Sequence, residues 1–336
     1  MDAIGRISLS CLEANNHSYS NTRIQWVLDM VLSRRRFLHK AAGLAAGSVC
    51  GMTFASAHAE IHLGDIRLDV VKDGSLTLPG ALIFDPMPQA DLNPILKKYQ
   101  LSATQLTRPC NVTVMRQGER TILFDVGAGA GFSPDTGQLL ASLDSLDIAP
   151  EDVTDVVFTH AHPDHLWGVL DDFDDPLFNR ARYMIGTKEW DYWLNPNTVT
   201  DIGEARASFA VGAERRLRMI EDNVQFFGDG DEILPGVVAR ATYGHTPGHM
   251  SFEVRDGSTS VMILGDCIGN HHVAFERPDW PSGADHDQTT AARTRLSLLD
   301  QLAHEQIRII GFHLVGDGIG HVDKTPGGYR FVPEGL

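Results

Sequence analysis

The chain has 336 residues, 43% of them hydrophobic and 21% charged, which is the composition of a globular protein with a sizeable core and excludes long disordered or fibrous regions. The formal net charge of −16 disfavours contact with a phosphate backbone. Because no basic stripe follows residue 60, we expect no nucleic-acid partner.

The first 59 residues have the features of an export signal. Ser33-Arg34-Arg35-Arg36-Phe37-Leu38 resembles the twin-arginine motif. The uncharged run Ala41–Phe54 that follows is short for a membrane span, and Ala57-His58-Ala59 has the small residues that a signal peptidase accepts. Twin-arginine leaders usually begin only a few residues before the arginines, so we expect translation to start at Met30.

These features predict two parts. Residues 1–59 form a leader that the twin-arginine export machinery recognises, either cleaved or kept as an anchor, and residues 60–336 form a single domain in the periplasm. The sequence is compatible with a monomer or a homodimer.

In the first half of this domain, apolar residues alternate from Ile61 to Lys72, which predicts a strand or hairpin followed by a loop rich in Pro and Gly. Asn111–Met115 and Thr121–Phe124 predict a hairpin around Gln117-Gly118-Glu119. Thr136–Leu146 has apolar residues at helical spacing.

In the second half, the buried strand Asp155–Phe158 stops where a run of histidines begins. Helices are predicted over Ala205–Ile220 and Thr289–His304. Further strands are predicted over Val237–Thr242, Met250–Val254, Val261–Leu264 and Ile307–Ile310. This order of elements indicates an α/β protein of two packed sheets flanked by helices, with its chemistry at strand ends.

The chemistry is concentrated in His160-Ala161-His162-Pro163-Asp164-His165, which places four ligand-type side chains within six residues. Extended spacing lets His160 and His162 converge on one ion, and the turn that follows lets Asp164 and His165 point to a second ion nearby. Three further motifs add candidate ligands: Tyr243-Gly244-His245-Thr246-Pro247-Gly248-His249, Leu264-Gly265-Asp266 and Gly311-Phe312-His313.

This ordered set resembles the metallo-β-lactamase superfamily, over most of residues 110–330. The resemblance implies a four-layer αββα sandwich and a binuclear hydrolase that uses a metal-bridging hydroxide on an ester, a lactone or an organophosphate triester. It also implies that His160, His162 and His245 bind one metal, that Asp164, His165 and His313 bind the other, and that Asp266 bridges both. Asp164 and Asp266 are then the catalytic carboxylates. We expect two divalent ions, zinc before iron or manganese.

Asp266 separates branches of that superfamily. The β-lactamases lack a bridging carboxylate here, so a penicillin-type substrate is disfavoured, although a metallo-β-lactamase stays an alternative. Acyl-homoserine lactonases place a Tyr three residues after this Asp, and here that position is Gly269. Lactone opening would therefore need another electrophile.

Further stretches resemble the methyl parathion hydrolase family of secreted phosphotriesterases: Glu189–Leu194, Gly244–Met250 and Gly318–Pro333. That resemblance implies that Phe132 and Trp193 frame a pocket for a small-molecule substrate. His271 and His272 lie where that family is apolar, so they predict a wider and more polar pocket wall.

Four more residues have predicted structural roles. We interpret His249 and His321 as structural residues or as residues behind the ligands, because the ligand set is complete without them. Cys110 and Cys267 are expected to be buried and reduced, with Cys267 pointing away from the metals.

Two other classes of protein stay open. His and carboxylate ligands also suit iron, so an iron-dependent oxidoreductase acting on sulfur or oxygen is an alternative on the same fold. A non-catalytic binding protein is the third class.

Overall fold

The computed structural model of the chain describes residues 60–335, and both the predicted leader and the Met30 start lie outside the described residues. Among residues 60–335, no helix combines the length and the apolar character needed to cross a bilayer.

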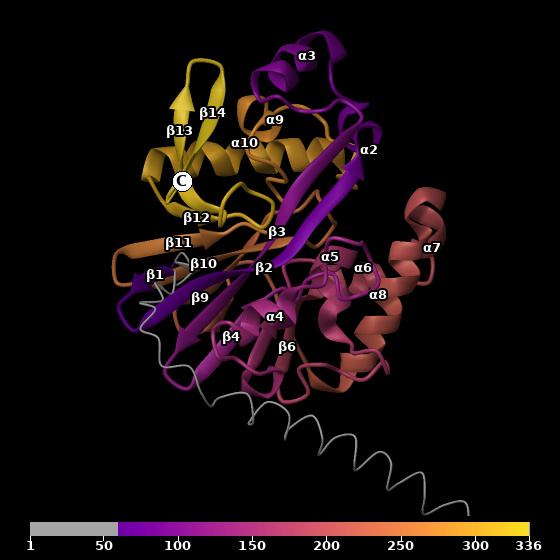
Figure 1. Ribbon diagram of the computed structural model, residues 1–336, viewed down its shortest axis with the longest axis vertical. Helices are drawn as coiled ribbons and strands as arrows, with labels where there is room; N and C mark the ends of the chain where they lie inside the picture. The colour runs from indigo at the N-terminus through magenta and orange to yellow at the C-terminus, as the bar shows by residue number, and fades with distance from the viewer. Residues whose placement is uncertain (1–59, 336) are drawn as a thin grey trace, which may run out of the picture. The chain divides into compact units, whose positions relative to one another are not determined.

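Two seven-stranded sheets form the centre of the described chain (Figure 1). The first sheet follows chain order; its strands pair antiparallel from β1 to β4 and parallel from β4 to β7. They are β1 (Glu60–Leu63), β2 (Ile66–Pro79), β3 (Gln105–Gln117), β4 (Arg120–Phe124), β5 (Asp155–Val157), β6 (Arg182–Gly186) and β7 (Val224–Phe227).

The second sheet has the order β14-β13-β12-β11-β10-β9-β8 and is antiparallel except where β11 pairs with β12. Its strands are β8 (Glu232–Leu234), β9 (Val237–Ala241), β10 (Met250–Asp256), β11 (Thr259–Ile263), β12 (Arg308–Ile310), β13 (Ile319–Thr325) and β14 (Gly328–Pro333).

The described residues form nine helices. They are α2 (Gly80–Phe84), α3 (Gln89–Lys98), α4 (Leu139–Asp144), α5 (Pro163–Leu166), α6 (Thr187–Leu194), α7 (Thr198–Asp201), α8 (Ala207–Ile220), α9 (Val273–Glu276) and α10 (Gln288–Glu305). Of these, α4, α6 and α8 cover the outer face of the first sheet, and α9 and α10 cover that of the second. Short 3₁₀ turns occur at η1 (Pro150–Asp152), η2 (Trp167–Val169), η3 (Glu204–Arg206) and η4 (Glu221–Asn223).

Side chains on alternate faces of the strands contribute to three separate hydrophobic clusters. On β4, Ile122 and Phe124 pack between the two sheets, whereas Leu123 packs on the opposite face, in the cluster that α4, α6 and α8 complete. On β11, Val261 also lies between the sheets, and Met262 packs outward into the cluster that includes residues of α9 and α10. Because successive side chains point to opposite faces, β4 and β11 each contribute to two cores. The predicted four-layer αββα sandwich is therefore confirmed.

Most predicted elements are present, and one prediction is wrong. The hairpins near Ile61 and Gln117 and the helices ending near Ile220 and His304 are confirmed. A loop was expected after Lys72, but β2 continues to Pro79 and is followed by α2 and α3. The strand continues because β3 pairs with it along its whole length, and a register shift between Lys72 and Gly74 absorbs the irregular sequence.

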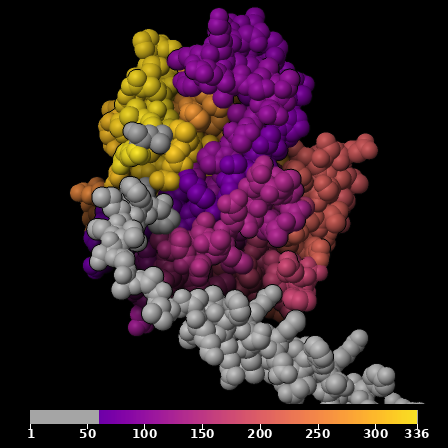
Figure 2. Space-filling model, in the orientation of Figure 1, coloured from indigo at the N-terminus to yellow at the C-terminus, as the bar shows by residue number. Residues whose placement is uncertain are grey.

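Helices α2 and α3 form a separate apolar cluster that includes Phe84, Leu92 and Trp280. Figure 2 shows the purple α3 against the orange and yellow C-terminal part of the chain, where Lys98 of α3 pairs with Glu276 of α9. This contact connects α3 to α9.

Candidate metal centre

The histidine-rich loop begins where β5 ends and leads into α5. Strands β4 and β5 are parallel neighbours, so Asp125, just after β4, lies beside this loop. One Asp125 oxygen accepts the backbone N–H of Thr159 at 2.8 Å, and the other lies 2.8 Å from His165 Nδ1. Asp125 has a φ of +65°, a strained conformation for a non-glycine residue, and these bonds hold it there.

Three buried imidazoles form the first group of candidate ligands, His160, His162 and His245. His162 Nδ1 lies 3.0 Å from His160 Nε2 and 3.0 Å from His245 Nε2. The first two residues come from the loop after β5 and His245 from the loop after β9, so this group joins the two sheets.

The second group contains Asp164, His165, Asp266 and His313, all buried. Asp266 follows β11 and His313 follows β12, and these strands are parallel neighbours, so both residues emerge at one sheet edge. His313 Nε2 lies 3.1 Å from Asp164 Oδ2 and 3.2 Å from Asp266 Oδ2, and His165 Nε2 lies 3.2 Å from Asp266 Oδ1.

Asp266 lies between the two groups. Its Oδ2 is 3.5 Å from His245 Nε2 of the first group, in addition to its contacts with the second. Gly265, just before it, has a φ of +58°, and a Cβ there would lie 2.7 Å from His249 Nε2. This position therefore needs glycine for both its backbone conformation and its packing.

The outward nitrogens of the histidines already have partners. His165 Nδ1 pairs with Asp125, His245 Nδ1 lies 3.0 Å from Asp285 Oδ1, and His313 Nδ1 lies 2.7 Å from the carbonyl oxygen of Pro109. Carboxylate and carbonyl oxygens only accept, so each of these Nδ1 atoms donates and each Nε2 presents a lone pair to the centre.

His160 follows the same rule. The Thr159 hydroxyl donates its single hydrogen to Asp125, so it accepts from His160 Nδ1. Burial first, and neighbouring imidazoles after it, hold the pKa of both His160 and His162 well below the usual value, so both rings are neutral.

The centre is thus lined by buried lone pairs that face one another. Among the described residues, four of these atoms have no hydrogen-bond partner: Asp164 Oδ2, His165 Nε2, Asp266 Oδ1 and His313 Nε2. Unpaired buried acceptors are costly, and neutral imidazole and carboxylate are the ligands that zinc-class cations prefer. The donor set therefore fits two divalent cations.

Comparison with known proteins agrees with this geometry. The sequence profile of the metallo-beta-lactamase superfamily matches residues 106–306. The chain belongs to the metallo-β-lactamase superfamily. An uncharacterized protein of Mycobacterium tuberculosis is 27% identical over 200 residues, which are 57% of this chain and 80% of that protein. The N-acyl homoserine lactonase AttM of Azorhizobium caulinodans is 27% identical over 128 residues, 37% of this chain and 44% of the lactonase.

The solved structure of AidC, a dizinc quorum-quenching lactonase with a bound product, is also similar. It has a TM-score of 0.78 and 27% identity, with 83% of this chain and 98% of that chain covered. The predicted membership of the metallo-β-lactamase superfamily is confirmed, and so is its coarse consequence that the chain is a hydrolase.

Two aromatic residues were predicted to frame the substrate pocket of this superfamily member, and they have different positions. Phe132 lines a cavity of about 50 Å³ together with His162 and Asp164. Trp193 is only 1% exposed and packs edge-on against His162, with ring centroids 5.8 Å apart. Trp193 therefore supports the wall from behind.

His271 and His272 lie at a different cavity from Phe132. Both line a cavity of about 290 Å³ that His313 also lines. His272 is buried, and its Nδ1 accepts the backbone N–H of Val273 at 2.9 Å, which caps α9. His271 is half-buried and is the more accessible of the two.

The remaining predicted structural residues lie outside the ligand groups. His249 Nε2 accepts the backbone N–H of Asp266 at 2.9 Å, so it positions that carboxylate from behind. His321 lies on β13 and faces Asp323 at 3.7 Å. Cys110 and Cys267 are buried free thiols; Cys267 donates to the Leu264 carbonyl oxygen, and burial raises its pKa to about 12.

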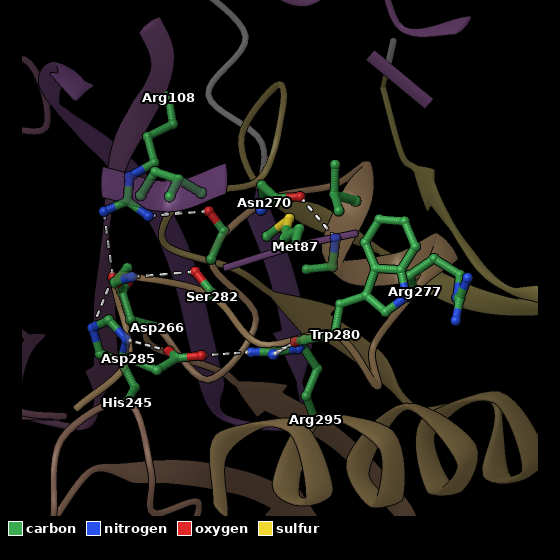
Figure 3. A pocket seen from close by; sticks show the side chains of 15 residues that line it. Met87, Arg108, His245, Asp266, Asn270, Arg277, Trp280, Ser282, Asp285 and Arg295 are labelled. Atoms are coloured by element: carbon green, nitrogen blue, oxygen red, sulfur yellow. Dashed lines mark hydrogen bonds and ion pairs between the residues drawn. The ribbon is translucent and has the colours of Figure 1, made fainter. Parts of the chain in front are cut away.

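Sequence reasoning missed the residues that hold the ligands. Asp285 lies between His245 and the buried Arg295, as Figure 3 shows, and His286 Nε2 lies 2.9 Å from His162 Nε2. Glu189 accepts from the loops that carry His162 and His245. The adjacent Asp285-His286 pair was the one local signal available; the others become visible only when distant segments are brought together.

Proposed function

We propose that this chain is a dizinc hydrolase that cleaves an ester-type bond, in a lactone, an aryl ester or a phosphotriester, of a small molecule with an apolar substituent. The observation that carries the proposal is Asp266, which contacts both groups of candidate ligands and lies among four buried ligand atoms that have no hydrogen-bond partner in the described part of the chain. When bound, two such cations lower the pKa of water and polarise the oxygen of the bond to be cleaved.

The residues of the chain supply position and surroundings. His160, His162 and His245 would hold one cation, Asp164, His165 and His313 the other, and Asp266 would be shared. Asp164 also lines the cavity beside Phe132, so it is placed to pass a proton to the leaving oxygen. The partners on the outward nitrogens keep the lone pairs aimed inward before a cation binds.

The form of the cavity supports an apolar substituent. Beside His162 and Asp164 it is lined by aliphatic and aromatic side chains: Leu76, Leu78, Leu82, Phe132 and Phe209. The names of the two similar lactonases support a substrate of this kind. AttM is an N-acyl homoserine lactonase, and AidC has an N-acyl homoserine product bound.

The test combines metal analysis with a substrate panel. We expect about two zinc ions per chain after expression with zinc, and hydrolysis of at least one N-acyl lactone, aryl ester or phosphotriester. Asp266→Ala should lose at least one metal and most turnover, whereas Asp256→Ala, an exposed carboxylate on β10 of the same sheet, should change neither. A chain with two metals that hydrolyses nothing in the panel would contradict the proposal, and iron content with oxygen uptake would favour the oxidoreductase.

We also propose that the enzyme acts in the periplasm after twin-arginine export, on the strength of the sequence motif Ser33–Leu38. Replacement of Arg34 and Arg35 by Lys should retain the precursor in the cytoplasm, which cell fractionation would detect.

A further inference from the structure

Arg108 of β3 is a buried cation beside the candidate metal centre, and the proposed metal-binding roles do not use it. Its side chain is 8% exposed, and its Nη2 lies 3.8 Å from Asp266 Oδ2. Figure 3 shows the guanidinium directed at Asp266. Its Nη1 donates to the Gly269 carbonyl oxygen at 3.2 Å, and among residues 60–335 its Nε has no hydrogen-bond partner.

Three cavities meet at Arg108. It lines the apolar cavity beside Phe132, the polar cavity beside His271, and a small cavity of about 20 Å³ that Asp266 also lines. Arg108 is the one residue that these three cavities share. A substrate that reaches the candidate ligands from any of these sides therefore passes its guanidinium.

Gly269 makes room for this arrangement. A Cβ at Gly269 would lie 3.1 Å from Arg108 Nη1, closer than ordinary van der Waals contact. Gly269 has no side chain that could itself polarise a substrate oxygen, and the lack of a Cβ leaves space for the Arg108 guanidinium.

The charge of this group needs an anionic counterpart. A buried guanidinium is costly without one, and Asp266, its nearest carboxylate, also faces two groups of candidate metal ligands. The fixed fork of an Arg binds carboxylate and phosphoryl oxygens well, and Nη2, at 3.8 Å from Asp266 Oδ2, lies beyond hydrogen-bond distance of that carboxylate.

We propose that Arg108 is a catalytic residue that donates hydrogen bonds to the oxygen on which negative charge develops during hydrolysis. This inference rests on the proposed function. The water oxygen forms a bond to the carbonyl carbon or phosphorus, and the electron pair of the C=O or P=O bond moves onto the oxygen that Arg108 contacts. When that pair returns, the bond to the leaving oxygen breaks; one water proton goes to the leaving oxygen and the other remains with the acid product, which releases it to solvent.

The experiment compares Arg108→Gln and Arg108→Lys with Arg116→Gln in the full chain. Arg116 lies on the same strand, pairs with Asp69 and also has an unpaired buried Nε among the described residues, so it controls for loss of a charge from β3. We expect R108Q to lower kcat about 100- to 1,000-fold with wild-type metal content, R108K to fall between R108Q and wild type, and R116Q to keep wild-type kcat.

Binding of inorganic phosphate gives a readout that does not depend on turnover. This binding, measured by calorimetry on metal-loaded protein, should weaken about tenfold or more in R108Q and remain unchanged in R116Q. Equal kcat and equal phosphate affinity in R108Q and wild type would overturn the role of Arg108, as would a loss of activity that follows loss of metal. If the wild type hydrolyses nothing in the panel, the proposed function fails, and the phosphate measurement alone decides whether Arg108 binds an anionic oxygen.

Discussion

Glu189 of α6 should be a main determinant of both stability and metal retention. Its Oε1 accepts the backbone N–H of Ala161 at 2.9 Å and Trp193 Nε1 at 2.6 Å, and its Oε2 accepts the Thr246 hydroxyl at 2.7 Å and the Gly248 N–H at 3.0 Å. The side chain is completely buried. One carboxylate thus connects the loop of His160 and His162 to the loop of His245.

The expected magnitude follows from these four bonds. In Glu189→Gln the amide oxygen can keep Ala161 and Trp193, and the Thr246 hydroxyl can turn to accept from the new NH₂ group. The Gly248 N–H then faces another donor, and one unpaired buried donor costs about 1–3 kcal/mol of the free energy of unfolding. Glu189→Ala loses all four bonds, about 4–6 kcal/mol at about 1–1.5 kcal/mol each, which approaches the whole stability of a marginal domain.

Urea denaturation of metal-free protein would measure the free energy of unfolding, and competition with a coloured chelator would measure metal affinity. We expect E189Q to weaken binding of at least one metal about 10- to 100-fold, because the loop of His245 loses its bond from Gly248 to the side chain that also holds the loop of His160 and His162. Asp191→Asn, an exposed carboxylate on the same helix, is the matched control and should change neither quantity. If E189Q stays within about 0.5 kcal/mol of the wild type and binds metal equally well, the anchoring role is refuted.

Three other perturbations test separate parts of the structure. Phe132→Ala should widen the cavity and shift the kcat/KM ratio between bulky and small substrates about tenfold or more with unchanged metal content; unchanged ratios would exclude a pocket role for Phe132. Removal of metal by a chelator should lower Tm by at least about 5 °C, because ligands bound only to the folded state stabilise it by about 2.7 kcal/mol at 100 times their Kd; an unchanged Tm in calorimetry would argue against tight binding. Burial lowers the pKa of His272 to about 3, so its neutral form stabilises the fold fully above pH 6.5 and this contribution is lost as the pH falls toward 3. Between pH 7 and pH 5 the free energy of unfolding of the wild type should therefore fall by about 2 kcal/mol more than that of His272→Asn, which keeps an acceptor for Val273. Equal losses in the two proteins, measured by urea denaturation at both pH values, would contradict the assignment.

The fold was predictable where the sequence has strong local periodicity. The alternation around Ile61, the turn at Gly118 and the helical spacing of Thr289–His304 all depend on nearby residues, and these elements are present. The extension of β2 to Pro79 depends on pairing with β3, which begins 26 residues later at Gln105, and a bulge near Gly74 hides the alternation. Long-range pairing of this kind leaves no local pattern in a single sequence.

The candidate ligands were predictable for a related reason. His160–His165 is compact enough to be selected by residue type and spacing. Asp266 and His313, each three residues after the end of a strand, were selected through the resemblance to the metallo-β-lactamase superfamily. The partners of these residues are chosen by tertiary contacts instead. Asp125, Glu189 and Asp285 each reach a ligand or its loop across at least 28 residues of sequence, and a lone carboxylate in a strand end or helix gives no sign of that contact.

The candidate ligands come from both sheets, so the metal centre depends on both halves of the fold. The loop after β5 belongs to the first sheet, whereas His245, Asp266 and His313 follow strands of the second. Cations held by both sets would cross-link the sheets at the edge where their loops meet, and removal of the cations would remove that cross-link. The partners behind the ligands hold the imidazole rings in place: Asp125 and Pro109 fix ring orientations from the first sheet, and Asp285 does so from the loop before α10. We therefore expect the imidazole rings to keep their orientations before metal arrives, so that metal binding stabilises an existing arrangement and does not have to create one.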